Sequence, residues 1–174
     1  EVDIDSPLKA ITSGIAYLPR DRQNEGLMGE MSTGENITIE NLKKVSSRGV
    51  INHQERVAVA EKFINEFAVK TTGYHQPITS LSGGNQQKAL FARLMNSECN
   101  ILILDGPTRG VDVGSKKEIH GFIKEFVREE KRRAVILVSS EVPEIIEVCT
   151  RALVMKEKKI KKCLQGDQLE RTTI

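Results

Sequence analysis

The stretch TSLSGGNQQKALFARLMNSECNILILDGPTRGVD, residues 79–112, decides the fold of this chain. Its glycine turn at Leu81–Gly84 opens a helix, and the unpaired N–H groups and positive dipole end of a helix N-terminus attract phosphate. The apolar run Ile101–Leu104 is typical of a short strand and ends in Asp105, whose carboxylate can hold Mg²⁺. A second turn leads to Asp112, which begins the next helix. The pattern predicts an α/β fold with a mainly parallel sheet flanked by helices.

Two motifs inside this stretch carry a family resemblance. LSGGNQQK resembles the signature motif of ATP-binding cassette (ABC) ATPases, and ILILD with GPTRGVD resembles their magnesium-acid strand and D-loop. The spellings LSGG-NQQK and RGVD-VGSK are similar to those in the ATP-binding proteins of bacterial sugar importers, which carry two tandem cassettes in one chain. Because two adjacent motifs occur in the right order and spacing, the resemblance is specific, and it extends from about Gly14 to Leu164.

The resemblance implies a nucleotide-binding surface around the signature turn. Ser82 and the amides of Gly83 and Gly84 would contact the γ-phosphate of an ATP molecule that the opposing cassette holds. Asn85 and Asp112 would belong to the same surface. The alternative is that Ser82 only caps the helix, because serine is a good N-cap without any ligand.

The chain departs from the family at three positions of its own ATP site. The resemblance assigns Mg²⁺ binding to Asp105, but Gly106 stands where the family has the glutamate that polarises the attacking water. A glycine has no side chain that orients or deprotonates water. Ser140 stands where many ABC ATPases have the histidine that contacts the γ-phosphate. The residues GIAYLPRDRQNEGL resemble the segment at the Q-loop, which senses metal and nucleotide, but Arg20 replaces the usual glutamate. The alternative is a surface loop with solvated charges.

Composition excludes several other classes of protein. The 174 residues suit one domain, with 39% hydrophobic and 29% charged residues. The net charge of +2 gives no reason to expect nucleic-acid binding. The sequence shows no apolar run of transmembrane length and no signal peptide. Its three cysteines lack metal-ligand spacing and indicate reduced thiols in the cytosol.

Periodicity and turn residues divide the chain into elements and regions. We expect a helical subdomain over about residues 29–80, a core with the signature and D-loop over about 81–150, and a C-terminal hairpin and tail over about 151–174. In the first half of the chain we expect a helix from Pro7, a strand over Ile15–Leu18, a helix from a Ser32–Glu35 capping box to about Lys43, and a helix that follows a second capping box at Asn52 and Glu55. The core should contain a helix over about Gly83–Met95, the strand Ile101–Leu104, a helix after Asp112, and a strand over Ala134–Val138 that is buried on both faces. A helix from Pro143 to about Val148 and a hairpin of Ala152–Met155 with Ile160–Leu164 should follow.

Side-chain patterns refine these elements. The apolar faces are predicted to be Val57, Ala60, Phe63, Ile64 and Phe67 on one helix, and Ile119, Phe122, Ile123, Phe126 and Val127 on another. His53 and His75 are interpreted as ordinary surface residues, since neither has a ligand companion at metal spacing. His120 lies beside the second apolar face and is interpreted as an ordinary surface or boundary residue. The lysines from Lys156 to Lys162 suggest a solvated strand edge.

A P-loop pattern, G-x-x-x-x-G-K-[ST], does not occur in these 174 residues. The most similar segment, Gly110–Lys116, differs from the pattern in the spacing of its glycines and lysine. We therefore expect the chain to be the C-terminal part of a cassette whose P-loop lies just upstream of Glu1, and the lack of an initiating methionine agrees with this. We also expect no measurable ATP hydrolysis by the chain alone.

The resemblance implies an ATP-binding subunit of an ABC importer, with a simple sugar as the transported solute and with ATP and Mg²⁺ as cofactors. Its partners would be a second cassette, transmembrane permease subunits and, indirectly, a solute-binding protein, at the inner face of the cell membrane in the cytoplasm. The alternative is a non-catalytic regulatory or assembly cassette that lends a signature surface to a partner. A nucleic-acid-handling ABC protein is a third possibility, which the NQQK and RGVD spellings disfavour.

A sheet without its P-loop strand would leave unpaired strand edges and an uncovered apolar helix face. We therefore expect self-association through the strands near Ile101–Leu104 or Ala134–Val138, because edges of this kind pair with other chains.

Overall fold

A three-stranded parallel sheet lies at the centre of the computed structural model, which describes residues 3–130, 132–166 and 168–169. Its strands are β1 (Ile15–Leu18), β4 (Ile101–Asp105) and β5 (Ala134–Val138), in the order β1-β4-β5. Leu18 pairs with Leu104, and Asp105 pairs with Val138. The predicted α/β fold with a parallel sheet is confirmed, and each strand lies where the apolar runs indicated.

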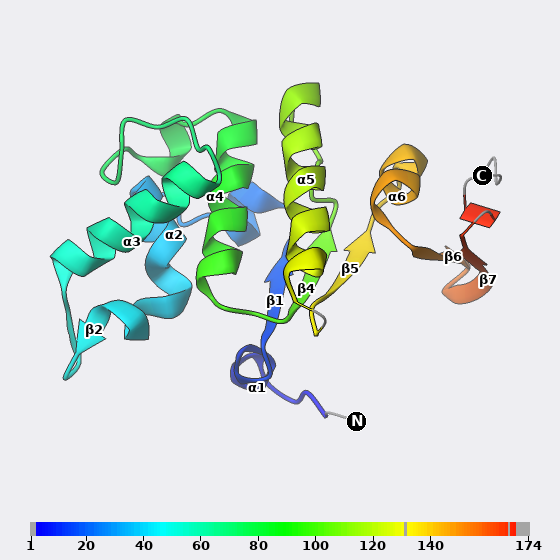
Figure 1. Ribbon diagram of the computed structural model, residues 1–174, viewed down its shortest axis with the longest axis horizontal. Coiled ribbons are helices and arrows are strands. Elements are labelled where there is room, and N and C mark those ends of the chain that lie inside the picture. Colours follow the sequence, from blue (N-terminus) through cyan, green and yellow to red (C-terminus); the bar gives the residue numbers. More distant parts are fainter. Residues whose placement is uncertain (1–2, 131, 167, 170–174) are drawn as a thin grey trace.

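Two long helices, α4 (Gly83–Asn96) and α5 (Val113–Glu129), cover one face of this sheet (Figure 1). The side chains of Leu18, Leu102 and Leu104 point to this side and are at most 1% exposed. They join Phe91, Ile119, Ile123 and other apolar residues of both helices in one core. This is the burial that alternate residues of a strand provide when only one face is covered.

The opposite face of the sheet is apolar and open over the described residues. Tyr17, Ile136 and Val138 are 53%, 54% and 49% exposed. The prediction that β5 is buried on both faces was therefore wrong. A continuous apolar run shows that both faces can be buried, but it does not show that the chain itself supplies both covers.

The helical region lies between β1 and α4. Its elements are α2 (Thr33–Thr38), η2 (Ile39–Val45), β2 (Ser46–Ser47), β3 (Val50–Ile51), α3 (His53–Glu66) and η3 (Ile78–Ser80). The Ser32–Glu35 capping box is confirmed, with bonds in both directions. At α3, Asn52 accepts from the amides of Gln54 and Glu55, and the reciprocal bond of a full capping box is not formed by Glu55.

The predicted continuous helix to Lys43 was wrong, since α2 ends at Thr38. Asn41 has φ −131° and ψ 46°, outside helical geometry, and its side-chain amide donates to the carbonyl oxygen of Asn96 at 2.8 Å. This tertiary hydrogen bond links the kink to the end of α4. The predicted apolar face of α3 is present. It consists of the buried residues Ala60, Phe63, Ile64 and Phe67, and Val57 is half-buried.

Aromatic rings connect the helical region to the core. Phe63 and Phe67 stack at 6.4 Å, and Phe67 lies 4.6 Å from Phe122 on α5. Phe122 is in turn 6.5 Å from Phe91 on α4. On α5 the predicted apolar face is present except at Val127, which is 44% exposed.

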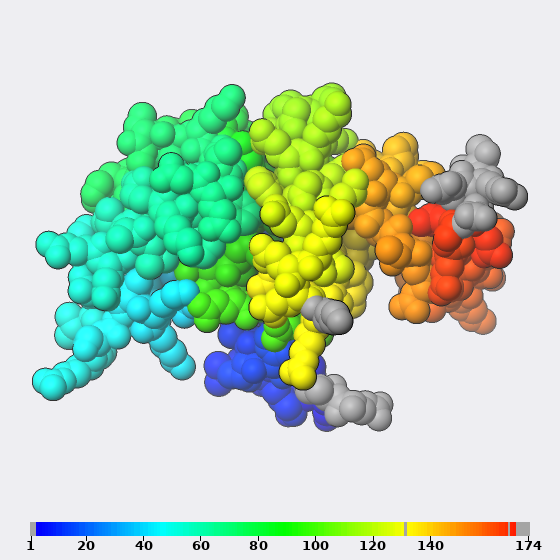
Figure 2. All heavy atoms as spheres, in the orientation of Figure 1, coloured from blue at the N-terminus to red at the C-terminus, as the bar shows by residue number. Residues whose placement is uncertain are grey.

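The remaining elements lie at the two ends of the chain. A short α1 (Pro7–Thr12) precedes β1, while α6 (Val142–Val148), β6 (Arg151–Lys156) and β7 (Lys159–Gln165) follow β5. The predicted hairpin is confirmed as the antiparallel pair β6–β7. Figure 2 shows it as a lobe at the end of the molecule opposite the helical region. Among the described residues, no helix is both long and apolar enough to cross a bilayer.

Candidate functional site

The signature turn lies directly against the D-loop. A Cβ atom at Gly84 would lie 2.2 Å from Ser115 Oγ and 3.1 Å from Asp112 Oδ2. At Gly83 it would lie 2.6 Å from Arg22 Nη2 and 3.1 Å from the carbonyl oxygen of Gly110. Real Cβ atoms do not approach other atoms as closely as at Gly84, so position 84 requires glycine, and the Gly83 contact is also tight. Two turns that are far apart in the sequence are thereby brought into contact.

Ser82 occupies the N-cap position of α4, but its side chain makes no capping hydrogen bond. Instead its hydroxyl oxygen accepts from the side-chain amide of Asn85 at 2.9 Å. Asn85 also accepts, through Oδ1, from the backbone amide of Lys70 at 2.8 Å. The alternative that Ser82 serves as a conventional cap is therefore wrong. The Ser82 hydroxyl is exposed and oriented by Asn85.

Asp112 begins α5 as predicted, and its carboxylate accepts from both the amide and the hydroxyl of Ser115, at 3.0 and 2.7 Å. These hydrogen bonds lower the pKa of Asp112, the bond from the Ser115 amide contributing most. Its carboxylate is thus stabilised in the charged form beside Gly84. A carboxylate at this point fixes the start of α5 relative to the signature turn.

Arg22 joins the D-loop to the signature helix. Its guanidinium donates to the carbonyl oxygens of Arg109 and Gly110 at 3.0 and 3.4 Å, and to Gln86 Oε1 on α4 at 3.3 Å. It stands at the start of η1 (Arg22–Gly26), and burial lowers its pKa. The interpretation of this segment as a loop with merely solvated charges is wrong for Arg22. No local pattern identified this role, because its three partners are remote in the sequence.

Asp105 lies at the carboxyl end of β4, as expected for the acid of this motif. Its Oδ1 atom is 3.6 Å from Arg20 Nε, and it is buried without a hydrogen-bond partner. Gly106 has φ +58°, and a Cβ atom there would lie 3.8 Å from Arg20 Nε. Position 106 therefore has room for a side chain but a backbone conformation that favours glycine.

The side chains at this strand end do not fit a bound Mg²⁺. Magnesium keeps several water ligands and is held by the negative charge of one or two carboxylates, whereas Asp105 Oδ1 lies 3.6 Å from the guanidinium of Arg20. Residues 3–130, 132–166 and 168–169 contain no cluster of three or more His, Cys, Asp or Glu side chains suited to a metal ion. His53 and His75 are exposed, and their rings are 6.1 Å apart.

Ser140 lies just beyond β5, at the same end of the sheet as Asp105. Val138 accepts from the amide of Gly106 at 2.8 Å, so the D-loop and the segment after β5 leave the sheet together. Ser140 itself is exposed. Ser139 accepts from the amide of Glu141 at 3.0 Å, and Glu141 pairs with Lys116 on α5 at 2.7 Å.

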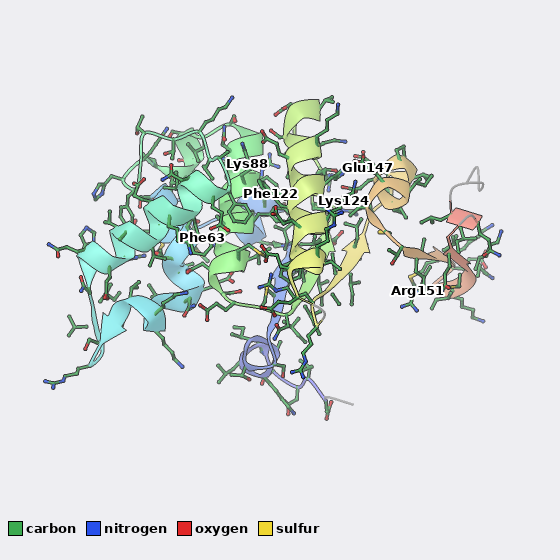
Figure 3. All side chains as sticks on the ribbon, in the orientation of Figure 1. Phe63, Lys88, Phe122, Lys124, Glu147 and Arg151 are labelled. Atoms are coloured by element: carbon green, nitrogen blue, oxygen red, sulfur yellow. The ribbon has the colours of Figure 1, made fainter. Side chains whose placement is uncertain are left out.

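A buried polar cluster fastens the D-loop to α6, and sequence reasoning missed it. Thr108 donates to Glu144 Oε1 at 2.8 Å, and His120 Nε2 lies 3.3 Å from the same oxygen. His120 Nδ1 lies 3.1 Å from Glu147, which also pairs with Lys124 at 3.3 Å (Figure 3). Thr108, His120 and Glu144 are 1%, 6% and 3% exposed.

The prediction that His120 is a surface or boundary residue was wrong, because α6 packs over this part of α5 and leaves His120 only 6% exposed. The sequence did contain a signal for this contact between α5 and α6, namely acidic residues spaced along one helix and basic residues spaced along the other. Glu144 and Glu147 share one face of α6, and His120 and Lys124 share one face of α5. Hydrogen bonding to His120 is the main cause of a lowered pKa at Glu147.

Gly84→Ala is expected to destabilise the protein by about 1–3 kcal/mol, the usual cost of overpacking. The added methyl group would displace Ser115 and with it the start of α5. Thermal unfolding measures the loss, at about 2–4 °C for each kcal/mol in a chain of this size. The matched control is Gly121→Ala on α5, where a Cβ atom meets nothing within 4 Å. It should be neutral or stabilising. If Gly84→Ala unfolds at the wild-type temperature, the close contact described here is incorrect.

Sequence comparison places this site in a known family. Residues 2–109 match the family described as ABC transporter. The chain is 44% identical over 168 residues to the ribose import ATP-binding protein RbsA of Shouchella clausii, covering 97% of this chain and 33% of that protein. It is 42% identical over 160 residues to the xylose import ATP-binding protein XylG of Thermoanaerobacter pseudethanolicus, covering 92% and 31%. The chain thus spans about a third of the length of these curated relatives.

Solved structures show the same fold. The ATP-binding cassette MJ0796, in a dimeric post-hydrolysis state bound to ADP and Pi, superimposes with a TM-score of 0.75 at 20% identity. The match covers 94% of this chain and 68% of that one. A second dimeric structure of MJ0796 gives a TM-score of 0.76, also at 20% identity, over 93% and 68% of the two chains. The solved structures agree with this fold, and the match of residues 2–109 establishes that the chain belongs to the ABC transporter family.

Proposed function

We propose that this chain is a segment of the ATP-binding subunit of an ABC importer for a simple sugar. The observation that carries the proposal is the contact between the signature turn and the D-loop, in which Gly84 lies beside Asp112 and the Ser82 hydroxyl at the start of the same turn is exposed. Its relatives are named as ribose and xylose import proteins, which supports a pentose or a similar sugar as the transported solute.

In this proposal the signature surface serves an ATP molecule held by a second cassette. Ser82, the amides of Gly83 and Gly84, and Asn85 form the part that faces the phosphates, while Asp112 supports the D-loop behind it. Helix N-termini with oriented polar groups bind phosphate because their amides and dipole are not otherwise satisfied. The transmembrane permease subunits and, indirectly, a solute-binding protein would be the other partners, at the cytoplasmic face of the membrane.

The second candidate is a regulatory or assembly cassette that supports hydrolysis only at a partner's site. Three residues at the chain's own site favour it. Gly106 offers no general base, Arg20 lies beside Asp105, and Ser140 replaces a histidine. Both candidates use the same signature surface, so they differ in what happens at Asp105.

A hybrid protein tests the proposal directly. In it, this chain replaces the matching segment of the Shouchella clausii ribose import protein, with which it is 44% identical. We expect the hybrid to co-purify with the transmembrane subunits of that importer and to bind ATP. The matched control carries Ser82→Arg, which should preserve folding and permease binding but weaken the ATP-dependent closure of two cassettes. A folded hybrid that fails to co-purify with the transmembrane subunits would contradict the importer function.

We further expect the isolated chain to self-associate through the open sheet face. Tyr17, Ile136 and Val138 form an apolar surface with no cover among the described residues, and such surfaces mark association sites. Light scattering over a wide concentration range should show species larger than a monomer. Ile136→Lys should reduce them, whereas Val50→Lys, at an exposed site in β3 away from this face, should not. A chain that stays monomeric at all concentrations would contradict this expectation.

A further inference from the structure

We propose that Arg20 is a built-in counter-ion of Asp105 that keeps divalent cations away from the end of β4. The inference rests on the proposed function in one respect, namely that Asp105 stands at the position of the magnesium-binding acid. It goes further by assigning a role to a residue at which this chain departs from its family.

The topology brings Arg20 to Asp105. Leu18, the last residue of β1, pairs with Leu104 in the parallel register, so the two chains leave the sheet at the same edge. Arg20 follows β1 by two residues, and its Nε atom lies 3.6 Å from Asp105 Oδ1. This oxygen is buried and accepts no hydrogen bond in the structure, although the Asp105 side chain as a whole is 28% exposed. The guanidinium is therefore the charge that Asp105 Oδ1 faces.

Gly106 lies directly beside this pair. A Cβ atom at Gly106 would lie 3.8 Å from Arg20 Nε and 3.9 Å from Arg20 Cγ, which is ordinary van der Waals contact. Positions 20 and 106, the two that distinguish this strand end, are therefore neighbours in the structure.

The electrostatic consequence concerns any divalent cation. A cation that approached Asp105 would meet a positive charge at close range, and the attraction of one carboxylate would be largely cancelled. The other charged side chain beside Gly106 is Arg109, whose Cβ would lie 3.7 Å from a Cβ at that position. Hard cations need several oxygen ligands, and the arrangement around Asp105 supplies one carboxylate facing a guanidinium.

Binding of Mn²⁺ alone, followed by NMR on the whole 174-residue chain, tests the proposal. Mn²⁺ broadens amide resonances close to its binding site, so the residues of β4 and Gly106 report directly on Asp105. For the wild type we expect no selective broadening there. Arg20→Gln should raise the apparent affinity on the order of tenfold, and Arg20→Glu should raise it further because it adds a carboxylate. Arg20→Lys keeps the charge and should behave like the wild type.

Two further variants separate this effect from others. Arg109→Gln removes a nearby arginine that forms no ion pair with Asp105 in the structure, and it should leave Mn²⁺ binding unchanged. Adding Asp105→Asn to Arg20→Gln should abolish the gain. The NMR spectrum of each variant also shows whether it is folded.

The proposal is overturned if the wild type binds Mn²⁺ at Asp105 as tightly as Arg20→Gln does, or if the gain survives Asp105→Asn. It is also overturned if none of the Arg20 variants binds, because Arg20 would then not be what excludes the cation. None of these measurements includes nucleotide or permease, so their failure would leave the hybrid test of the proposed function unaffected.

Discussion

In the hybrid with the Shouchella clausii protein, the double variant Arg20→Glu/Gly106→Glu is expected to hydrolyse ATP at least about 10²-fold faster than the unaltered hybrid. A positioned general base contributes about 10²–10⁴-fold to a rate, and Gly106 supplies none. The isolated chain should show no turnover, since its sequence contains no P-loop pattern. A magnesium-dependent phosphate-release assay measures both quantities.

Gly106→Glu alone should increase the rate of ATP hydrolysis much less than the double variant does. Its new carboxylate would face Arg20 Nε, and the backbone at φ +58° is unfavourable for a residue with a side chain. Arg20→Glu/Gly106→Gln is the matched control, because glutamine has the size of glutamate but is no base. If Gly106→Glu alone is as fast as the double variant, the coupling between the two positions is wrong. If no variant hydrolyses ATP faster than the unaltered hybrid, another position such as Ser140 prevents hydrolysis at this site.

Arg93→Met is expected to lower the free energy of unfolding by about 3 kcal/mol or more. Arg93 is 5% exposed and donates to the carbonyl oxygens of Asn36 and Gly26 at 2.6 and 2.5 Å, and to Asn36 Oδ1 at 2.6 Å. Asn36 Oδ1 would keep the Met28 amide as a donor at 2.9 Å, but a buried carbonyl oxygen left without a partner costs about 1–3 kcal/mol. Burial also lowers the pKa of Arg93, although its hydrogen bonds keep the guanidinium well satisfied.

Thermal unfolding should show a decrease in Tm of about 6–12 °C for this loss. Hydrogen exchange should accelerate in both η1 and α2, because Arg93 holds both segments to α4. Arg128→Met, at an exposed position of α5, is the matched control and should lie within about 0.5 kcal/mol of the wild type. An Arg93→Met protein with wild-type stability would show that Asn36 and Gly26 find other donors.

The sequence predicted helices and strands correctly where the interactions that define them are made by residues close together in the chain. The Ser32–Glu35 box, the strand Ile101–Leu104 and the cap at Asp112 depend on neighbours within a few residues, and all three are present. The two glycine turns of the candidate site were also evident from sequence. Their mutual contact was not, because it depends on how α4 and α5 pack.

The wrong predictions share one physical cause. Residues that are distant in the sequence decide whether a side chain is buried and which groups it bonds. Asn41 leaves the helix for a carbonyl group on α4, and His120 is buried because α6 carries two carboxylates towards it. A charged residue in a loop also gives no sign of whether it is solvated or paired. Arg20 and Arg22 stand two residues apart in the same polar segment, yet one faces Asp105 and the other binds the D-loop backbone.

The parallel pairing of β1 with β4 has a consequence for synthesis of the chain on the ribosome. The whole helical region and α4 lie between these two strands in the sequence. At about 5–20 residues per second, β1 emerges several seconds before the strand that will pair with it. The helical region, with its own capping box and aromatic contacts, can form during that interval. A nascent chain stalled just before β4 should therefore already protect α3 from proteolysis while β1 remains open to cleavage.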